Sequence, residues 1–235
     1  EMMESVIALS DDDVDFSLYD TIMLIHAGAG QETDVADDSR VQLWSSFYSQ
    51  GDIDNAFPDS TVYGLPTNDE VAGEPFLVDN FMLVPEASAQ DDYTIGSLGV
   101  WAFEVASRIG LLPLFDADPP GAADSRGAAS YDLMAQGLFN GHVTPDLTLW
   151  PGFVPGFPSV FNRVLAGWVD PLVVEEDGTY SIRDINSPEA GDTACIKIPI
   201  TESEYWLVVN RVHDTNFHLI PRTGAQPGPS FHFFS

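Results

Sequence analysis

Apolar residues recur every three or four positions in the middle of the chain, over the segment 95–109. The recurring positions are Ile95, Leu98, Trp101, Val105 and Ile109. This spacing places them on one face of an α-helix, and the following Gly110 and Pro113 are typical of residues that end one. The pattern therefore predicts a helix over 95–109, around which the rest of the chain is organised.

Four other segments are apolar without helical spacing and are bounded by Gly, Pro or polar residues, which predicts strands. They are 20–28, 75–85, 194–200 and 204–211. The continuous run 20–28 is typical of a strand covered on both faces, whereas the proline at each end of 75–85 favours an edge strand. An Asp-Gly pair between 172–174 and 180–183 predicts a hairpin.

The remaining segments are predicted to be mostly irregular. They are the acidic lead-in 1–17, the largely polar loop 31–74 and the proline-rich stretch 149–158. After the last of these, Ser159 is expected to cap a short helix that reaches Trp168. No linker divides the remaining chain, so we expect one domain over 18–235.

The charge of the chain limits its partners. It has 37 acidic and 8 basic residues and a net charge of −29. Nucleic acid and anionic membranes require clustered Lys and Arg, so we expect neither as a partner, and the apolar runs fall short of the roughly 20 residues that cross a bilayer. Plain solubility, adaptation to high salt and calcium binding each account for the acidity. We favour a salty extracellular setting with some calcium.

The helix 95–109 has the frame of a zinc-protease active-site helix. In the sequence His-Glu-x-x-His, two imidazoles lie one turn apart and bind zinc, while the Glu activates the metal-bound water. Here Phe103 stands at the first His position and Ser107 at the second, and Glu104 alone is retained. The frame is therefore kept without its imidazole ligands.

Five segments, taken in order along the chain, resemble the immune inhibitor A family of secreted zinc metallopeptidases. They are His26-Ala27-Gly28-Ala29-Gly30-Gln31-Glu32, the helix and turn 95–116, Tyr131-Asp132-Leu133-Met134-Ala135-Gln136-Gly137, Ala166-Gly167-Trp168-Val169 and Glu204-Tyr205-Trp206-Leu207-Val208-Val209-Asn210-Arg211. The resemblance implies a zincin-like α/β (α+β) domain with a twisted mixed sheet, the former active-site helix at its centre and a β-rich C-terminal part. It also implies secretion, and a domain truncated at its C-terminus relative to the family.

The same resemblance maps the family's zinc-ligand positions to Phe103, Ser107 and Pro113. A phenyl ring and a proline offer no donor atom, and a serine hydroxyl is a poor zinc ligand, so zinc is not expected. Glu104 remains as a vestigial base with no metal to acidify its water. We interpret Phe103 as filling the metal cavity and Arg108, one turn after Glu104, as the partner that neutralises this carboxylate.

Calcium is a second metal that the sequence leaves open. Asp116 and Asp118, in the turn after the helix, are candidate ligands, and the acidic loop 52–59 is a weaker candidate because it lacks the Gly and terminal Glu of an EF-hand. Solvated loop carboxylates are the plainer interpretation of both.

Three further residues have a chemical and a structural interpretation. His26 could be a ligand, but a lone His on an apolar strand is more often a hydrogen-bonded core residue. Met134 would underlie the metal in an active relative, and core packing is a sufficient role here. Cys195 is the single cysteine and is expected to be a small buried residue, so no disulfide forms within the chain.

These observations favour a catalytically inactive, secreted metallopeptidase homologue. It would act as a structural or binding subunit of an extracellular assembly, with protein partners or its own copies as neighbours and no membrane insertion. The alternative is an active extracellular metalloprotease with an atypical ligand set and Glu104 as general base. A third hypothesis, a decoy that binds peptides without cleaving them, is not separable from the structural role by sequence.

Overall fold

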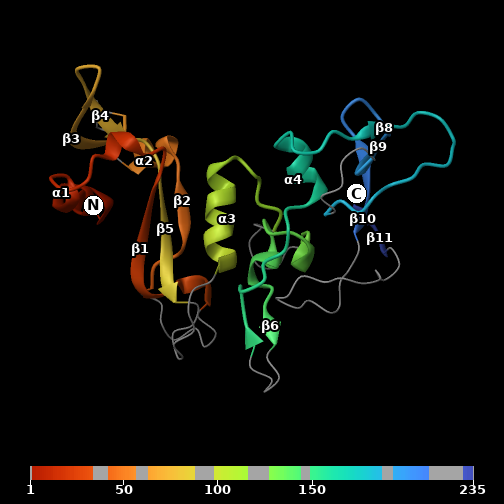
Figure 1. Ribbon diagram of the computed structural model, residues 1–235, viewed down its shortest axis with the longest axis horizontal. Helices are drawn as coiled ribbons and strands as arrows, with labels where there is room; N and C mark the ends of the chain where they lie inside the picture. The colour runs from red at the N-terminus through yellow and green to blue at the C-terminus, as the bar shows by residue number, and fades with distance from the viewer. Residues whose placement is uncertain are drawn as a thin grey trace, which may run out of the picture. The chain divides into compact units, whose positions relative to one another are not determined.

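The computed structural model describes residues 2–33, 42–56, 63–87, 98–115, 127–143, 149–186, 193–211 and, as backbone only, 230–234. The chain forms two compact units, 1–157 and 158–235, which we describe in turn (Figure 1). Small sheets and a few helices occur together, which confirms the predicted mixed α and β class. The predicted boundary at residue 18 and the single domain after it stay predictions.

The first unit is built on a three-stranded mixed sheet in the order β1-β5-β2 (Figure 1). β1 covers Ile22–Ala29, β5 Phe81–Ala87 and β2 Ser46–Tyr48. β5 pairs in parallel with β1 and antiparallel with β2. The first five residues of β5 are buried, as expected for the central strand of a covered sheet. β1 confirms the strand predicted over 20–28.

The predicted environment of β1 was wrong. A strand covered on both faces was expected, but β1 lies at the edge of its sheet, and most of its side chains are only partly buried. Ile25 is 49% exposed. A continuous apolar run does not distinguish a central strand from an edge strand, because position in the sheet depends on pairing with distant segments.

The strand predicted over 75–85 is two strands, and its predicted edge position was wrong. β4 (Glu74–Val78) ends before Asp79-Asn80, and β5 begins after this pair and occupies the centre of its sheet. Pro85 is tolerated there because its carbonyl oxygen accepts a hydrogen bond from the indole Nε1 of Trp101 at 3.0 Å. Its backbone therefore faces the helix α3 (Leu98–Arg108) rather than β1, so the missing N–H breaks no ladder bond to that strand.

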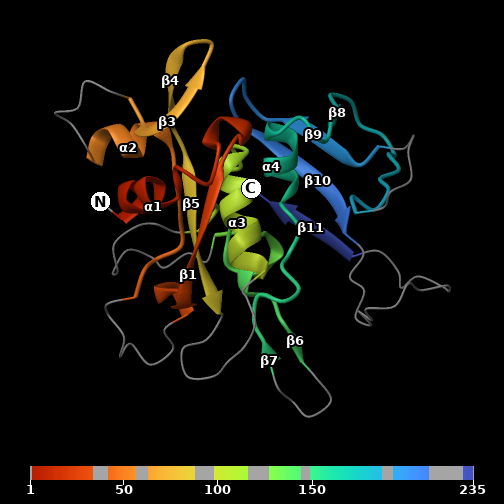
Figure 2. The ribbon, with the colours of Figure 1, turned by 60° about the vertical axis from the view of Figure 1, so that its left-hand side comes forward.

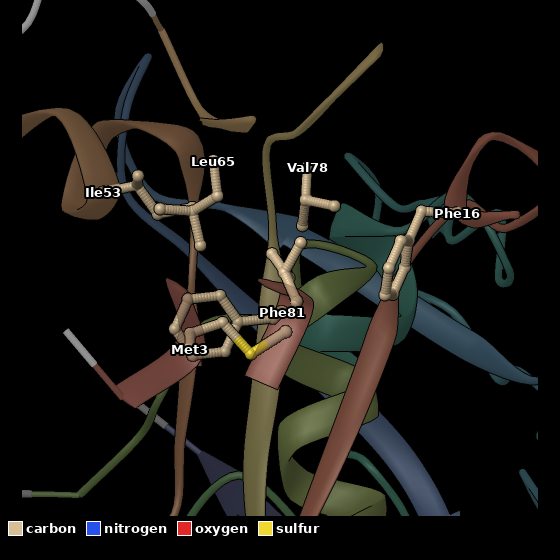
Figure 3. Packing of buried hydrophobic residues seen from close by; sticks show 7 residues of the cluster. Met3, Phe16, Ile53, Leu65, Val78 and Phe81 are labelled. Atoms are coloured by element: carbon tan, nitrogen blue, oxygen red, sulfur yellow. The ribbon is translucent and has the colours of Figure 1, made fainter. Parts of the chain in front are cut away.

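The N-terminal segment packs into a hydrophobic cluster at one end of the sheet (Figure 3). The elements that contribute to it are α1 (Met2–Ser10), the 3-10 helix η1 (Phe16–Leu18), α2 (Gln50–Ala56), β3 (Leu65–Val71), β4 and β5. The buried members are Met3, Ile7, Phe16, Ile53, Leu65, Val78 and Phe81. The acidic lead-in is therefore ordered because the apolar side chains of α1 pack into this core.

The prediction that 31–74 is mostly loop was wrong, because α2 and the β3–β4 hairpin occupy much of it. Of the acidic loop 52–59, a weak calcium candidate, residues 52–56 lie in α2 and 57–59 lie outside the described residues. In α2 the carboxylate of Asp52 accepts hydrogen bonds from the backbone N–H and the hydroxyl of Ser49, at 2.8 and 2.6 Å. These bonds lower the pKa of Asp52 from its ordinary value. Its carboxylate thus helps to start the helix.

The end of the first unit holds α3 and a series of short elements. They are the 3-10 helices η2 (Gln31–Thr33), η3 (Ala129–Tyr131) and η4 (Gln136–Phe139) and the strands β6 (His142–Val143) and β7 (Leu149–Trp150). α3 contacts β2, β5 and η4 (Figure 2). The stretch 149–158 was predicted to be irregular: 151–158 contain no helix or strand, but Leu149–Trp150 forms β7, so the prediction was wrong for these two residues.

The second unit consists of α4 (Val160–Leu165) and a four-stranded sheet in the order β11-β10-β9-β8 (Figure 2). The strands are β8 (Leu172–Val173), β9 (Cys195–Pro199), β10 (Tyr205–Arg211) and β11 (Ser230–Phe234). β9 and β10 confirm the two strands predicted in this region. The hydroxyl of Ser159 accepts the backbone N–H of Asn162 at 3.5 Å and caps α4 as predicted, but α4 ends at Leu165 and does not reach Trp168.

The predicted hairpin between 172–174 and 180–183 does not form. β8 pairs in parallel with β9, and 180–183 contains no strand. The Asp-Gly turn is held by side-chain contacts instead, because the Tyr180 hydroxyl donates to the Glu176 carbonyl oxygen at 2.9 Å and the ring lies over Gly178.

Within the described residues, no helix combines the length and the apolar character that a membrane crossing requires.

Candidate functional site

The helix α3 that carries the protease-like frame ends in a Schellman motif. Gly110 takes a left-handed conformation with φ of 89°. Its N–H donates to the Ser107 carbonyl oxygen at 3.0 Å, and the N–H of Leu111 donates to that of Ala106 at 3.0 Å. Leu111 and Ala106 are both buried, which supplies the hydrophobic contact that accompanies this motif. The helix predicted over 95–109 is confirmed from Leu98 onward, and 95–97 lie outside the described residues.

The three positions that the resemblance assigns to zinc ligands are spread along this helix and its exit. Phe103 is partly buried, and its ring lies 6.2 Å from that of Phe115, centroid to centroid. The Ser107 hydroxyl donates to the Phe103 carbonyl oxygen at 3.0 Å, one turn back. Pro113 is exposed in the segment after the helix. Phe103 therefore makes an aromatic contact, and the Ser107 hydroxyl is engaged by its own helix.

Glu104 is buried, with 4% of its surface exposed. Its carboxylate accepts a hydrogen bond from the backbone N–H of Phe47, the middle residue of β2. Burial raises the pKa of Glu104 from 4.5 to about 7; the Phe47 hydrogen bond opposes this shift, and the negative charge of Glu32 adds to it. Near neutral pH the side chain is therefore close to half protonated.

Glu32 is the second carboxylate of this region, and it is fixed by Ser45. The Ser45 hydroxyl donates to Glu32 Oε1 at 2.5 Å, and the Ser45 backbone N–H donates to Oε2 at 3.2 Å. The carboxyl folds back over Gly30, where a side chain would collide with it. These two bonds hold the charge of Glu32 near Glu104, a role that the sequence alone did not predict.

The predicted pair between Glu104 and Arg108 was wrong. Arg108 Nε donates to Asn80 Oδ1 at 2.9 Å, and its Nη2 donates to the Asp20 carbonyl oxygen at 3.1 Å. Asn80 Nδ2 also donates to the Asp20 carbonyl oxygen, at 3.1 Å. Arg108 thus ties the end of α3 to the start of β1 and the start of β5. The spacing of four residues favoured the pair only for an exposed helix surface, and Glu104 is buried.

This arrangement makes a prediction for a double-mutant cycle. Arg108→Met is expected to destabilise the first unit by about 2 kcal/mol, because the buried Asn80 carbonyl loses a charged donor. The coupling energy of Arg108→Met with Asn80→Ala should exceed its coupling with Glu104→Gln, since only Asn80 is bonded to Arg108. Urea unfolding of the three single and two double variants measures both couplings. A larger coupling with Glu104 would contradict the observed contacts.

Met134 packs in the core of the first unit, fully buried, in the turn that resembles the family's Met-turn. Its carbonyl oxygen accepts the backbone N–H of Leu114 at 2.7 Å, and its own N–H donates to Asp132 Oδ1 at 2.7 Å. Asp132 is also fully buried, and its second oxygen, Oδ2, has no hydrogen-bond partner. The turn therefore joins the segment after α3 to η4 through backbone bonds.

The other candidates do not come together with Glu104 into a described metal site. Asp116 and Asp118 lie outside the described residues. His26 Nδ1 lies 3.0 Å from the Ala27 carbonyl oxygen, and Nε2 is buried without a partner. Among the described residues, no three His, Cys, Asp or Glu side chains are grouped as a metal ion requires.

Cys195 in the second unit is fully buried at the start of β9. Burial raises the pKa of its thiol to about 11, and a backbone bond at Val208 opposes part of the shift. A thiol in this state is protonated at neutral pH and unreactive, as expected for a small core residue.

The site that emerges is a buried carboxyl of α3 bonded to the sheet edge, with a second carboxylate beside it. No protein-family model matches the chain, and no curated protein matches it. The resemblance to the immune inhibitor A family therefore rests on the sequence segments alone.

Proposed function

We propose that this protein is a catalytically inactive, secreted metallopeptidase homologue that serves as a structural or binding subunit of an extracellular assembly. In this proposal the zincin-like frame is kept for its shape. Proteins, including further copies of the chain, are the partners, and the acidic surface suits an extracellular setting. No zinc is required for the fold or the function.

One observation carries the proposal. The single residue of the frame that retains catalytic chemistry, Glu104, is 4% exposed and bonded to the backbone of Phe47. A general base must reach the proton that it removes, directly or through one water molecule. A carboxyl enclosed between a helix and a strand is placed for packing rather than for proton transfer to a substrate.

A second candidate, an active protease with an atypical ligand set, is favoured by one observation. The pKa of Glu104 is raised to about 7, close to the value that suits a general base at neutral pH. In that case Glu104 would activate a water molecule held by ligands other than the family's. Glu32, whose negative charge contributes to the raised pKa of Glu104, would be a candidate ligand.

Elemental analysis and peptide cleavage distinguish the two candidates. We expect the purified 235-residue chain to contain far less than one zinc ion per molecule and to leave a library of fluorogenic peptides intact. Chelator treatment and Glu104→Gln should change neither result. Stoichiometric zinc, with cleavage that is lost in Glu104→Gln, would overturn the proposal in favour of the enzyme.

A gain-of-function variant provides the positive control. Phe103→His, Ser107→His and Pro113→Asp together place two imidazoles one turn apart and a carboxylate after the helix, which is a ligand set that zinc accepts. This triple variant should bind zinc measurably more tightly than the wild-type chain in a competition assay. It shows that the assay detects a zinc site in this frame.

A further inference from the structure

β1 leaves one side of the sheet open. Among the described strands β1 pairs only with β5, and it lies at the end of the order β1-β5-β2. The opposite edge is different, because the outward N–H of Phe47 in β2 is bonded to Glu104 of α3. Among the described residues, the β1-β5-β2 sheet thus has one edge bonded to a helix and one edge without a strand partner.

Two hydrogen bonds establish which backbone groups of β1 face outward. The Pro85 carbonyl oxygen is bonded to Trp101, so Pro85 faces α3 and the preceding Val84 faces β1. Alternate residues of a strand direct their backbone groups to opposite sides, and Val84 is in register with Ile25. In a parallel ladder Val84 bonds to the residues on either side of its register partner. The backbone groups of Ile25 and, two residues away, Met23 are therefore directed to the open edge.

This edge has few of the features that normally prevent strand addition. Natural edge strands are protected by charged side chains, proline or a bulge. The segment 21–31 has no acidic or basic residue other than His26, although the chain carries 37 acidic side chains. The register of β1 is regular from Ile22 to His26, and its irregularity begins after His26. Ile25, in the middle of the regular run, is 49% exposed.

We propose that β1 pairs with β1 of a second copy of this chain in an antiparallel manner, about a twofold axis at Leu24. This register places Met23 opposite Ile25 of the second copy and Asp20 opposite Gly28, so that no acidic residue of the strand meets another. The inference deepens the proposed function, on which it rests for the idea of an assembly, by naming a second copy as the partner.

The absence of charge in β1 argues for a second copy over an unlike, basic partner. A basic partner would be attracted by acidic residues at the contact, and this segment contains none. Two chains of charge −29 repel each other, so a self-contact is tolerated best where both surfaces are neutral and where salt screens the remainder. Self-association should therefore become stronger as the salt concentration rises.

Sedimentation equilibrium of the 235-residue chain tests the proposal. The wild-type chain in 1 M NaCl should have twice its 25.6 kDa mass. Ile25→Lys should weaken the association at least tenfold, because a lysine at an open edge opposes strand pairing. Val71→Lys is the matched control, since Val71 lies on a different strand, is 50% exposed and undergoes the same change in charge. It should leave the association unchanged.

Disulfide trapping tests the register. In the double variant Met23→Cys and Ile25→Cys, the thiol at position 23 of one copy faces the thiol at position 25 of the other. The two strands are then at a spacing that a disulfide can bridge. Mild oxidation should yield a covalent dimer, whereas Val71→Cys should give none. The native Cys195 is buried and should not interfere.

The outcomes separate this inference from the proposed function. A chain that is monomeric in high salt, or a dimer equally weakened by both lysine variants, overturns β1 pairing. If such a chain also lacks zinc and cleavage, the inactive-homologue proposal is unaffected. A β1 dimer that contains zinc and cleaves peptides would reject the inactive homologue while keeping the inferred contact.

Discussion

Gly99→Ala is expected to destabilise the first unit by about 3 kcal/mol, although alanine is the better helix former. Gly99 is the second residue of α3, and a side chain there would collide with the carbonyl oxygen of Leu138 and lie 2.7 Å from its carbonyl carbon. Neither backbone can move easily. The N–H of Gly99 donates to the Gly152 carbonyl oxygen at 2.8 Å, and the N–H of Gly152 donates to that of Phe139 at 3.2 Å.

Gly51→Ala is the matched control for this prediction. Gly51 is the second residue of α2, and a methyl group there would approach only the Ser49 hydroxyl, at 3.8 Å. Alanine should therefore stabilise that position by up to about 1 kcal/mol. Urea unfolding of both variants measures the difference. Equal and favourable effects of the two substitutions would mean that α3 does not approach Leu138 as closely as described.

Glu104→Gln is expected to stabilise the first unit by about 3 kcal/mol at pH 8 and to have little effect near pH 4. The pKa of Glu104 is raised by folding from 4.5 to about 7, so the folded chain binds the proton more tightly than the unfolded chain. Below pH 4.5 both states are protonated and this group costs nothing. The stability difference grows as the pH rises and is complete above pH 7, where the buried carboxylate is ionised.

The glutamine side chain suits this test because its carbonyl oxygen can still accept the N–H of Phe47. Glu74→Gln removes the same charge from an exposed position on β4 and accounts for the general relief of repulsion in this acidic chain. Thermal or urea unfolding from pH 4 to pH 8 provides the comparison. A stabilisation by Glu104→Gln that is independent of pH, or equal to that of Glu74→Gln, would show that the carboxyl is not buried as described.

Local patterns predicted the elements that depend on a few neighbouring residues. The helix ended by Gly110 and the helix capped by Ser159 are both present, because the conformations of a left-handed glycine and of a hydroxyl cap are set within one turn. The strands predicted over 20–28, 194–200 and 204–211 are present as elements, whereas 180–183 contains no strand and 75–85 is divided into two. β1 is an edge and β5 a centre because of pairing between segments that are more than thirty residues apart, which no local pattern records.

The sequence predicted one residue of the candidate site, Glu104, but not the groups that contact it. The frame of the helix pointed to Glu104, but the donor that meets it is a backbone N–H of β2, which any residue type supplies. Likewise Arg108 binds an amide 28 residues earlier in the chain, Asn80, instead of the nearby carboxylate. Residue spacing in the sequence favoured a pair between Glu104 and Arg108 within one helix, but Glu104 is buried and does not meet Arg108.

The position of α3 along β2 has a consequence for the size of any assembly. An acidic β-protein with two open edges can add chains at both and grow into a filament. Here the hydrogen bond from Phe47 to Glu104 occupies the β2 edge. Pairing through β1 would therefore use the other edge of this sheet and leave none for a third chain. If the proposed pairing occurs, growth through this sheet therefore stops at two chains.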